Sequence, residues 1–399
     1  MRSLRWSWPI WAVAMLVAVP WIVYVLRAEQ PLKVVVLDKT VPYETRKEHR
    51  SLFWLLGHLK VVQPDGAPYD PSKDYVGAFP GAEPGDPPAR TVDLTTEVAM
   101  QADLIYLADT YGVYTGDLAS KASMKEALER SRRIYGGLTV QEANAVVAAA
   151  ESGKTVVAEF NTLGSPTSPE ARETLESLLG IRWTRWIGRF FPRLEDESEV
   201  PEWMRKNYER EWRQNWDFTG PGYVLLQDDV HCEVLRVGQE AEQLGLRIEK
   251  ENKAEPLLRG AREATVYPYW FDIVVTQPGT QTLARFEWNL TPAGYERLRA
   301  RGLPTSFPAV TYRQAANQGK TFYFAGDFAD NPMRSRAVPL AGYMTFRRWM
   351  ESGFLATSRQ AFYWRFYAPM VANILNSAAD ERATAVALGR LNAHEPVGP

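Results

Sequence analysis

The chain has one cysteine and four histidines among its 399 residues. A single cysteine excludes an intrachain disulfide, and so few cysteines and histidines exclude the usual Cys/His zinc patterns. The motifs GxSxG, GxGxxG and GxxxxGK[ST] are also absent, so nothing marks a serine hydrolase or a nucleotide-binding loop. Cys232 follows His231 directly, and neighbouring residues on a strand point to opposite faces. A catalytic Cys–His pair is therefore not predicted.

The chain lacks a large excess of positive or negative charge, because 46 lysines and arginines face 48 aspartates and glutamates. This balance gives no basic footprint, so nucleic acid is not predicted as a partner. Hydrophobic residues make up 45% of the chain and charged residues 24%. Those fractions are ordinary for a folded protein and exclude disorder as its main state. No cofactor is predicted and no metal-ligand set is assigned.

Trp6–Leu26 carries no charge and is flanked by aromatic residues. At about 1.5 Å per residue, a helix of this length matches the roughly 30 Å of a bilayer core. A cleaved signal peptide is the alternative, but Val25–Glu29 offers no small-x-small cleavage site. Lysines and arginines occur on both sides and do not decide the orientation. We expect residues 1–28 to be a short cytoplasmic tail and a single-pass anchor in the inner or plasma membrane, with the C-terminal domain extracytoplasmic.

Strand and helix patterns alternate from residue 32 to residue 180. The continuous apolar runs predict strands buried on both faces: Leu32–Leu37, Ala102–Ala108, Lys154–Phe160 and, later, Thr321–Ala325. Apolar faces and capping residues predict helices at 44–59, 139–151 and 168–180. Seven prolines and four glycines make Pro64–Arg90 a predicted long loop. The alternation predicts an α/β fold with a doubly wound, mostly parallel, flavodoxin-like sheet.

The residue pattern changes between residues 183 and 290. Tryptophans are mixed with charged residues there, and short strand patterns follow. We interpret this part as a Trp-rich and β-rich insertion. The predicted organisation is residues 29–182 for the first part of the α/β domain, 183–290 for the insertion, 291–383 for the return to the α/β domain and its C-terminal helices, and 384–399 for a flexible tail.

Polar residues follow the predicted strands. Open parallel sheets bind ligands beyond the carboxyl ends of their strands, so these residues are the candidate ligand-binding site. They are Asp38, Lys39, Asp109, Tyr111, Glu159, Asn161, Thr162, Asp327 and Asp330, with Arg189 as a further charge partner. Converging carboxyl groups suit acid–base work on a glycosidic bond or the binding of Ca²⁺ or Mg²⁺. Asp and Asn also occur in strand-exit turns for local reasons.

Four segments carry a family resemblance: LKVVVLDKT, ADLIYLADTYG, SGKTVVAEFNTLGS and GKTFYFAGDFAD. With their order along the chain, they resemble the class I glutamine amidotransferase-like superfamily. The nearest branches are the non-amidotransferase ones, such as trehalose-utilisation-type domains and the middle domains of some β-galactosidases. The family carries a cysteine at the strand-to-helix elbow, whereas this sequence has Glu159–Gly164 there without one. His231 and Glu233 fall in the predicted insertion and do not restore the family's His-x-Glu motif.

The resemblance implies an amidotransferase-like fold without amidotransferase activity, in branches associated with carbohydrate. We therefore expect binding or processing of envelope or extracellular carbohydrate at the strand ends. The first alternative is a noncatalytic interaction protein that docks an envelope protein through its Trp-rich segment, with Trp203 and Trp212 as the test positions. The second is a divalent-metal-dependent hydrolase.

Overall fold

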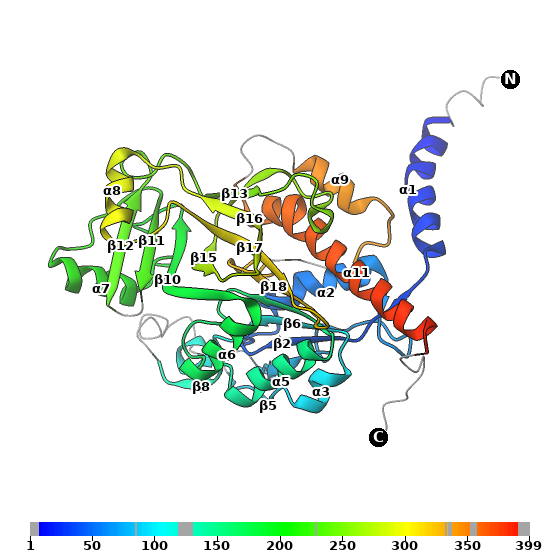
Figure 1. Cartoon of the computed structure of the whole chain (residues 1–399). Coiled ribbons are helices and arrows are strands. Elements are labelled where there is room, and N and C mark those ends of the chain that lie inside the picture. The colour runs from blue at the N-terminus through cyan, green and yellow to red at the C-terminus, as the bar shows by residue number, and fades with distance from the viewer. Residues whose placement is uncertain are drawn as a thin grey trace.

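A ten-stranded mixed sheet forms the centre of the computed structural model, which describes residues 8–83, 86–118, 131–227, 230–331, 333, 337–351 and 357–389 (Figure 1). Its strand order is β14-β13-β16-β17-β18-β9-β6-β2-β4-β5. The bounds are β2 Val34–Asp38, β4 Val76–Phe79, β5 Arg90–Val92, β6 Leu104–Asp109, β9 Thr155–Glu159, β13 Leu246–Lys250, β14 Ala264–Tyr267, β16 Gln281–Glu287, β17 Ser306–Gln314 and β18 Lys320–Phe324.

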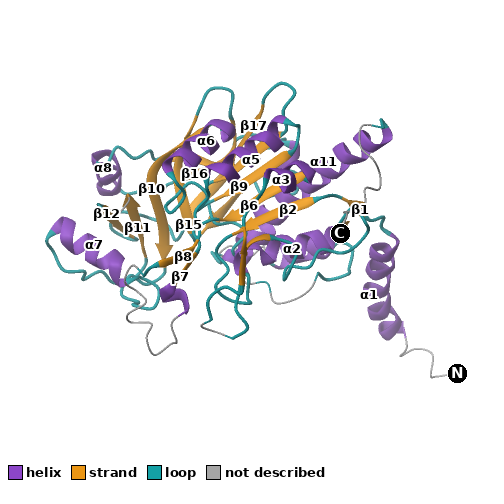
Figure 2. Cartoon of the chain, turned by 90° about the horizontal axis from the view of Figure 1, so that it is seen from below, coloured by secondary structure: helices purple, strands orange, loops and turns teal. Residues whose placement is uncertain are grey.

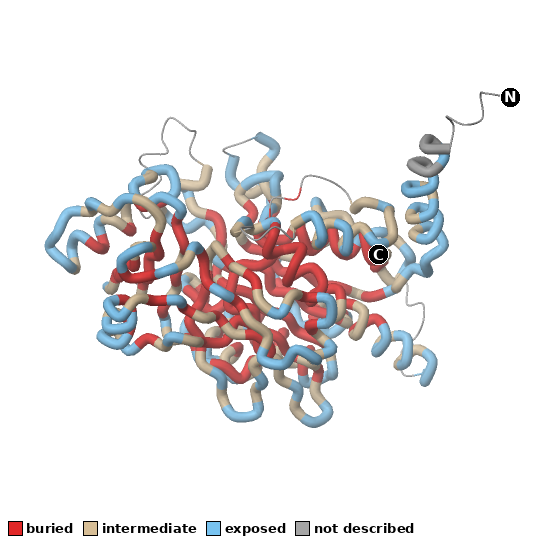
Figure 3. The backbone as a smooth tube through the Cα atoms, turned by 90° about the horizontal axis from the view of Figure 1, so that it is seen from above, coloured by how far each residue is buried: buried red, intermediate tan, exposed pale blue. Residues whose placement is uncertain are grey.

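Helices cover both faces of the parallel part of this sheet (Figures 1 and 2). One face carries α3 (Thr96–Gln101), α5 (Val140–Glu151) and α6 (Pro169–Leu179). The other carries α2 (Lys47–Leu59) and α11 (Ala368–Ala387). Because both faces are covered, every residue of β2, β6 and β9 is buried, as the continuous apolar runs predict. The core is the red interior of Figure 3.

The predicted boundaries of α5 and α6 are confirmed, whereas α2 begins at Lys47 and not at the predicted residue 44. Thr139 and Glu142 form the predicted capping box at the start of α5. Ser168 caps α6, and Gly180 ends it in a left-handed conformation. Local capping chemistry therefore defines these elements before any long-range packing.

The prediction of a doubly wound, mostly parallel sheet is wrong. Only β18, β9, β6, β2 and β4 pair in parallel, whereas β14, β13, β16, β17 and β5 pair antiparallel. A short turn at Asn317, with φ 60°, joins β17 to β18, and such hairpins connect only antiparallel strands. Strands of the predicted β-rich insertion thus extend the central sheet itself. Pro64–Arg90 also supplies β4, which was predicted as loop.

A second sheet is four-stranded and antiparallel, in the order β12-β11-β10-β15 (left in Figure 1). Its strands are β10 Ile181–Phe191, β11 Gly222–Gln227, β12 His231–Arg236 and β15 Trp270–Thr276, with α7 (Glu202–Trp212) and α8 (Pro292–Ala300) nearby. A small core of its own contains Phe191, Met204, Tyr208 and Cys232. Because Cys232 lies in this core, burial raises the pKa of its thiol, as expected for a structural cysteine.

The N-terminal helix α1 (Trp8–Leu26) requires a correction. Among the described residues, none of the helices is both long and apolar enough to cross a bilayer. This finding overturns the predicted transmembrane anchor, the single-pass membrane location and the extracytoplasmic placement. α1 has Pro20 in its interior, and the Pro20 carbonyl accepts a hydrogen bond from the backbone of Ala341. Tyr24 donates to the carbonyl of Gly57, so the second half of α1 contacts the folded body while its start points away (Figure 1).

The remaining described elements are short or peripheral. They are β1 Gln30–Pro31, β3 Val61–Val62, β7 Val113–Tyr114, η1 Thr115–Leu118, β8 Arg133–Tyr135, η2 Pro256–Leu258, α9 Tyr343–Met350, α10 Arg359–Phe362 and the π-helical turn η3 Tyr363–Tyr367. Residues 1–7 of the predicted cytoplasmic tail and 390–399 of the predicted flexible tail lie outside the described residues.

Candidate functional site

Four adjacent parallel strands bring buried acidic side chains to one edge of the sheet. Asp38 ends β2, Asp109 ends β6, Glu159 ends β9, and Asp327 follows β18. The strands lie side by side in the order β18-β9-β6-β2. These carboxyl groups, at most 8% exposed, together with their neighbours Glu48 and Asp330 form what we call the carboxylate cluster.

Asp38 is held by a buried histidine. Its Oδ2 lies 2.6 Å from Nδ1 of His49, and both side chains are fully buried. The other ring nitrogen of His49, Nε2, lies 3.0 Å from the carbonyl oxygen of Pro71. An oxygen faces each ring nitrogen, so the ring of His49 bridges the Asp38 carboxyl group and the loop at Pro71. Gly77, in a left-handed conformation with φ 137°, lets β4 approach the Asp38 backbone, where a Cβ would lie 1.7 Å from the carbonyl oxygen.

Asp109 sits in a cradle of hydrogen-bond donors. Its Oδ1 accepts from Thr40 Oγ1 at 2.6 Å and from the backbone of Tyr111 at 2.6 Å, and its Oδ2 accepts from Asn161 Nδ2 at 3.1 Å. Burial and the neighbouring negative charge of Asp38 outweigh these donors and raise the pKa of Asp109 to about 7. This carboxyl group can therefore give up or take a proton near neutral pH.

Glu159 ties the end of β9 to the loop after β18. Its Oε2 accepts hydrogen bonds from the backbone of Phe328 at 3.0 Å and of Ala329 at 2.9 Å, and Tyr106 donates to Oε1. Burial raises the pKa of Glu159 to about 8 despite these donors. With its oxygens occupied by the protein, Glu159 positions the loop that carries Asp327 and Asp330.

The elbow after β9 holds Asn161 in a left-handed conformation, with φ 67°. A positive φ is uncommon for residues other than glycine and is most tolerated by Asn and Asp. This conformation accompanies the hydrogen bond from the Asn161 amide to Asp109. Thr162 is buried and donates to the Glu159 carbonyl at 2.6 Å, which stabilises the turn rather than a ligand.

Residues from outside the strand ends complete the cluster, and the sequence did not predict them. Lys47 Nζ, at the start of α2, lies 3.5 Å from Asp330 Oδ2 and 3.7 Å from Glu48 Oε1. Tyr269 donates to Asp330 Oδ2 at 3.1 Å, and Arg359 Nη1 lies 3.2 Å from Asp330 Oδ1. Burial and the negative charge of Asp38 raise the pKa of Glu48. The three ionisable residues at the start of α2, Lys47, Glu48 and His49, precede its apolar face. This sequence pattern is the signal that could have identified Lys47 and Glu48 as members of the site.

Two predicted charge partners lie elsewhere. Lys39 points to the other side of its strand, where Nζ contacts Glu142 Oε2 at 2.7 Å and the Gly137 carbonyl at 3.0 Å. Arg189 pairs with Glu199 and lies over the ring of Tyr269, 5.2 Å from its centroid. Arg189 is thus connected to the cluster through the ring of Tyr269, whose hydroxyl group donates to Asp330.

Tyrosines and Lys47 form the accessible rim. The Lys47 side chain is 48% exposed, and Tyr43 and Tyr111 are 42% and 43% exposed. Tyr43 donates to the carbonyl of Asp117, the ring of Tyr111 lies 4.8 Å from that of Tyr114, and the backbone of Tyr114 donates to Asp117 Oδ2, which links the three tyrosines. We call these tyrosines and Lys47 the rim.

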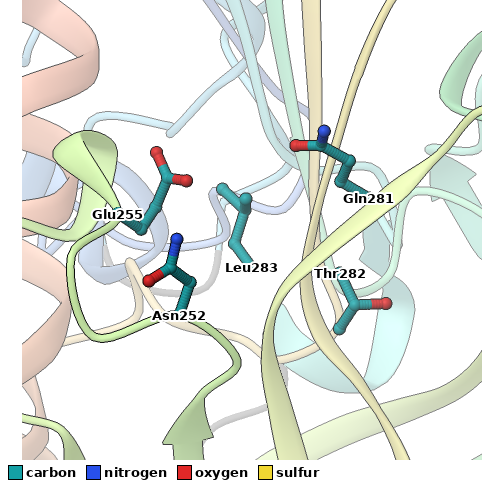
Figure 4. A pocket seen from close by; sticks show the side chains of 5 residues that line it. All are labelled: Asn252, Glu255, Gln281, Thr282 and Leu283. Carbon is teal, nitrogen blue, oxygen red and sulfur yellow. The ribbon is translucent and has the colours of Figure 1, made fainter.

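The cavity shown in Figure 4 lies away from this edge. It measures about 390 Å³ between the loop after β13 and strand β16, and its lining is Asn252, Glu255, Gln281, Thr282 and Leu283. None of the predicted site residues lines it. The chemistry of the strand ends, with its perturbed carboxyl groups, is the stronger indication of a site.

Most tryptophans of the Trp-rich segment are covered. Trp183 and Trp186 belong to the main core, and Trp203 and Trp216 pack against the second core. Trp212 is 39% exposed and donates from its indole to the Cys232 carbonyl. In the described part of the chain, no three His, Cys, Asp or Glu side chains are grouped so that they could hold a metal ion. The docking and metal alternatives remain predictions.

Comparison with known proteins gives distant structural neighbours. No protein-family model and no curated protein matches the chain. A putative ThuA-like protein from Bacteroides uniformis is 10% identical, with a TM-score of 0.37 over 84% of this chain and 97% of that one. A cytoplasmic protein from Salmonella typhimurium is 10% identical, with a TM-score of 0.37 over 87% and 98% of the two chains.

A β-galactosidase from a Rahnella species is 13% identical, with a TM-score of 0.31 over 74% of this chain and 28% of that one. The ThuA-like neighbour is of the kind that the sequence resemblance names. At such low identities and TM-scores, neither ligand nor activity follows from these similarities.

Proposed function

We propose that this chain binds carbohydrate at the carboxylate cluster, beside the exposed side chains of the rim. The observation that carries the proposal is the convergence of Asp38, Asp109 and Asp327 on adjacent strand ends, the edge where open α/β sheets take their ligands. Hydroxyl groups of a sugar are hydrogen-bond donors that carboxylate oxygens accept strongly.

The rim supports the same class of ligand. Tyr43 and Tyr111 expose ring surface beside buried polar groups. A site with apolar faces at its entrance and a few convergent polar groups inside is the usual form of a small-molecule site. The excess of carboxyl groups disfavours anionic ligands such as phosphates, because like charges would be brought together in a buried environment.

Hydrolysis of a glycosidic bond is the second candidate, and the protonation of Asp109 favours it. Glycosidases use one protonated carboxyl group as the acid and one carboxylate as the base or nucleophile. Asp109 holds a proton near neutral pH, and Asp38 ends the neighbouring strand, 2.6 Å from His49. These two residues would take the acid role and the carboxylate role.

Thermal unfolding of the full chain with oligosaccharides tests the binding proposal. A ligand that binds the native state raises the melting temperature. We expect a rise with at least one of cello-, chito-, xylo- and malto-oligosaccharides, and its loss in Asp109→Asn, measured against the baseline of that variant. Asp380→Asn, on the exposed side of α11, is the matched control and should keep the rise.

A rise that persists in Asp109→Asn would place the sugar elsewhere and contradict the proposal. The same oligosaccharides should then be assayed for new reducing ends. Turnover by the natural chain that Asp109→Asn loses would establish hydrolysis, and binding without turnover would leave a binding protein.

A further inference from the structure

The charges around the carboxylate cluster do not balance. Its acidic groups are Asp38, Glu48, Asp109, Glu159, Asp327 and Asp330, whereas the basic side chains that contact them in the described part of the chain are His49, Lys47 and Arg359. His49 contacts Asp38, and Arg359 lies 3.2 Å from Asp330 Oδ1 and over the ring of Tyr269, 4.1 Å from its centroid. Lys47 is therefore the one cation in this set that is half exposed and in contact with two members of the cluster.

Lys47 is held loosely. Its ammonium nitrogen is 3.5 Å from Asp330 and 3.7 Å from Glu48, while strong N⁺–H···O⁻ bonds measure about 2.7–2.9 Å. The side chain is 48% exposed, and a long lysine side chain can swing its charged end into water at little cost. Burial alone would lower the pKa of Lys47, but Asp330, Tyr269 and Glu48 outweigh it and raise that pKa. This corner of the cluster thus favours an ammonium group.

Two buried oxygens of neighbouring residues accept no hydrogen bond from the described residues, although Arg359 Nη1 lies 3.2 Å from that of Asp330. Oδ1 of Asp330 and Oδ1 of Asn331 accept no hydrogen bond within the described part of the chain, although Asp330 is 3% and Asn331 1% exposed. The other carboxylate oxygen of Asp330 is the one that faces Lys47 and Tyr269. Buried acceptors without donors are costly and are rare in folded proteins, so this corner is suited to a ligand that brings N–H donors.

We propose that the ligand of this site is a saccharide with a protonated primary amine, and that the amine takes the place of the Lys47 ammonium beside Asp330. The inference rests on the proposed function, since it assigns the class of sugar that the same site binds. Three N–H donors and a positive charge match the unpaired acceptors and the uncompensated carboxylates, which a hydroxyl or an acetylated amine would satisfy only in part. Lys47 is a stand-in for the ligand's amine while the site is free.

Calorimetric titration of the full chain with β-1,4-linked glucosamine oligomers and with the same oligomers fully N-acetylated tests the inference. The measurement is made at about pH 6, where most of the sugar amine is protonated. We expect the amine form to bind about tenfold or more tightly, because a charged hydrogen-bonded group is exchanged for a neutral one. Binding of the amine form should also weaken as salt is raised.

Three variants assign the effect to this corner. Lys47→Met removes the competing ammonium and should tighten amine binding, with little effect on the acetylated form. Asp330→Asn should abolish the preference for the amine, with circular dichroism as the check on folding. Lys253→Met removes an exposed lysine paired with Glu263 at 2.8 Å and should change nothing.

The outcomes separate the two proposals. Equal or tighter binding of the acetylated oligomer, or weaker amine binding in Lys47→Met, overturns the amine inference and leaves carbohydrate binding intact. Failure of both oligomers and of the neutral panel to bind overturns both proposals.

Discussion

Two charge-rich regions of this molecule are built in opposite ways. On the second sheet, Glu233 lies between Arg297 and Arg301, with N···O distances of 2.6 and 3.1 Å, and Arg301 also reaches Glu211 at 2.8 Å. We call these residues and the adjoining Arg236–Glu240 pair the arginine network. At the strand ends, by contrast, carboxyl groups gather with few cations.

The carboxyl pKa values move in opposite directions in the two regions. In the arginine network, burial alone would raise the pKa of Glu240, but hydrogen bonds from Arg236 outweigh it and lower that pKa. In the carboxylate cluster, burial and the negative charges of Asp330 and Asp109 raise the pKa of Asp327. The contribution of the arginine network to folding is enough to explain its paired charges. The carboxylate cluster has more acidic than basic side chains among the described residues, which lowers stability, and a ligand is the better explanation for it.

Breaking the arginine network should give the largest effect. Glu233→Gln leaves two arginines beside a neutral amide, and loss of one member of a buried charged network costs about 3–5 kcal/mol. Urea unfolding measures this loss. Glu249→Gln, which breaks an exposed pair with Arg247, should cost less than about 1 kcal/mol. A cost for Glu233→Gln no larger than that of the control would refute the structural role of the network.

The pH dependence of stability should separate the two regions. Asp109, with its pKa raised to about 7, and Glu159, with its pKa raised to about 8, bind protons in the folded state that the unfolded chain has released. Their contribution is full below about pH 4 and is lost as the pH rises through 7 and 8, at roughly 1.4 kcal/mol per unit for each group. Free energies of unfolding between pH 5 and 8 should therefore fall by about 3 kcal/mol for each of these two groups.

The carboxyl groups of the arginine network act in the other pH window. The lowered pKa values of Glu211 and Glu240 stabilise the fold above about pH 4.5, and this contribution is lost as the pH falls below that value. Asp109→Asn should flatten the decline above pH 5 and leave the acid side unchanged. An identical slope in Asp109→Asn and the natural chain would show that the cluster does not hold the protons.

Neutralising one member of the carboxylate cluster should change the free energy of unfolding least. The change should be a gain in stability, whereas breaking the arginine network causes a loss. Asp327→Asn removes a buried carboxyl group that has no cationic partner within 4 Å among the described residues, so we expect about 1–2 kcal/mol of added stability at pH 8. The gain should shrink as the pH falls, because burial raises the pKa of Asp327 and favours its protonated form. Thermal unfolding at both pH values measures it, with Asp380→Asn as the control. A loss of stability at pH 8 would mean that Asp327 is paired after all.

Local patterns predicted the parallel half of the fold well. The buried strands, the Thr139–Glu142 capping box and the ends of α6 depend on neighbouring residues, so the sequence carries their signals directly. The direction of β17 against β18 depends on pairing across the whole sheet. A short run of apolar residues looks alike in a parallel and in an antiparallel strand, which is why the mixed sheet was missed.

The candidate site was predicted in part for the same reason. Asp38, Asp109 and Asp327 were found because strand ends can be read from the chain. Lys47, Tyr269 and Arg359 come from a helix start, a loop and another helix start, and only the tertiary fold brings them together. Lys39 was misassigned because side chains alternate between the two faces of a strand, and its neighbour Asp38 takes the face towards the cluster.

Strand β18 belongs to both halves of the central sheet, parallel to β9 on one side and antiparallel to β17 on the other. The backbone of Asp327 donates to Trp270, and that of Asp272 to Ala325, so the start of β15, directly after Tyr269, is attached to the exit of β18. One wall of the site, including Tyr269, therefore comes from a segment that supplies none of the carboxyl groups. In an evolving lineage, changes between β14 and β15 could alter which molecule is accepted while the acidic residues stay in place.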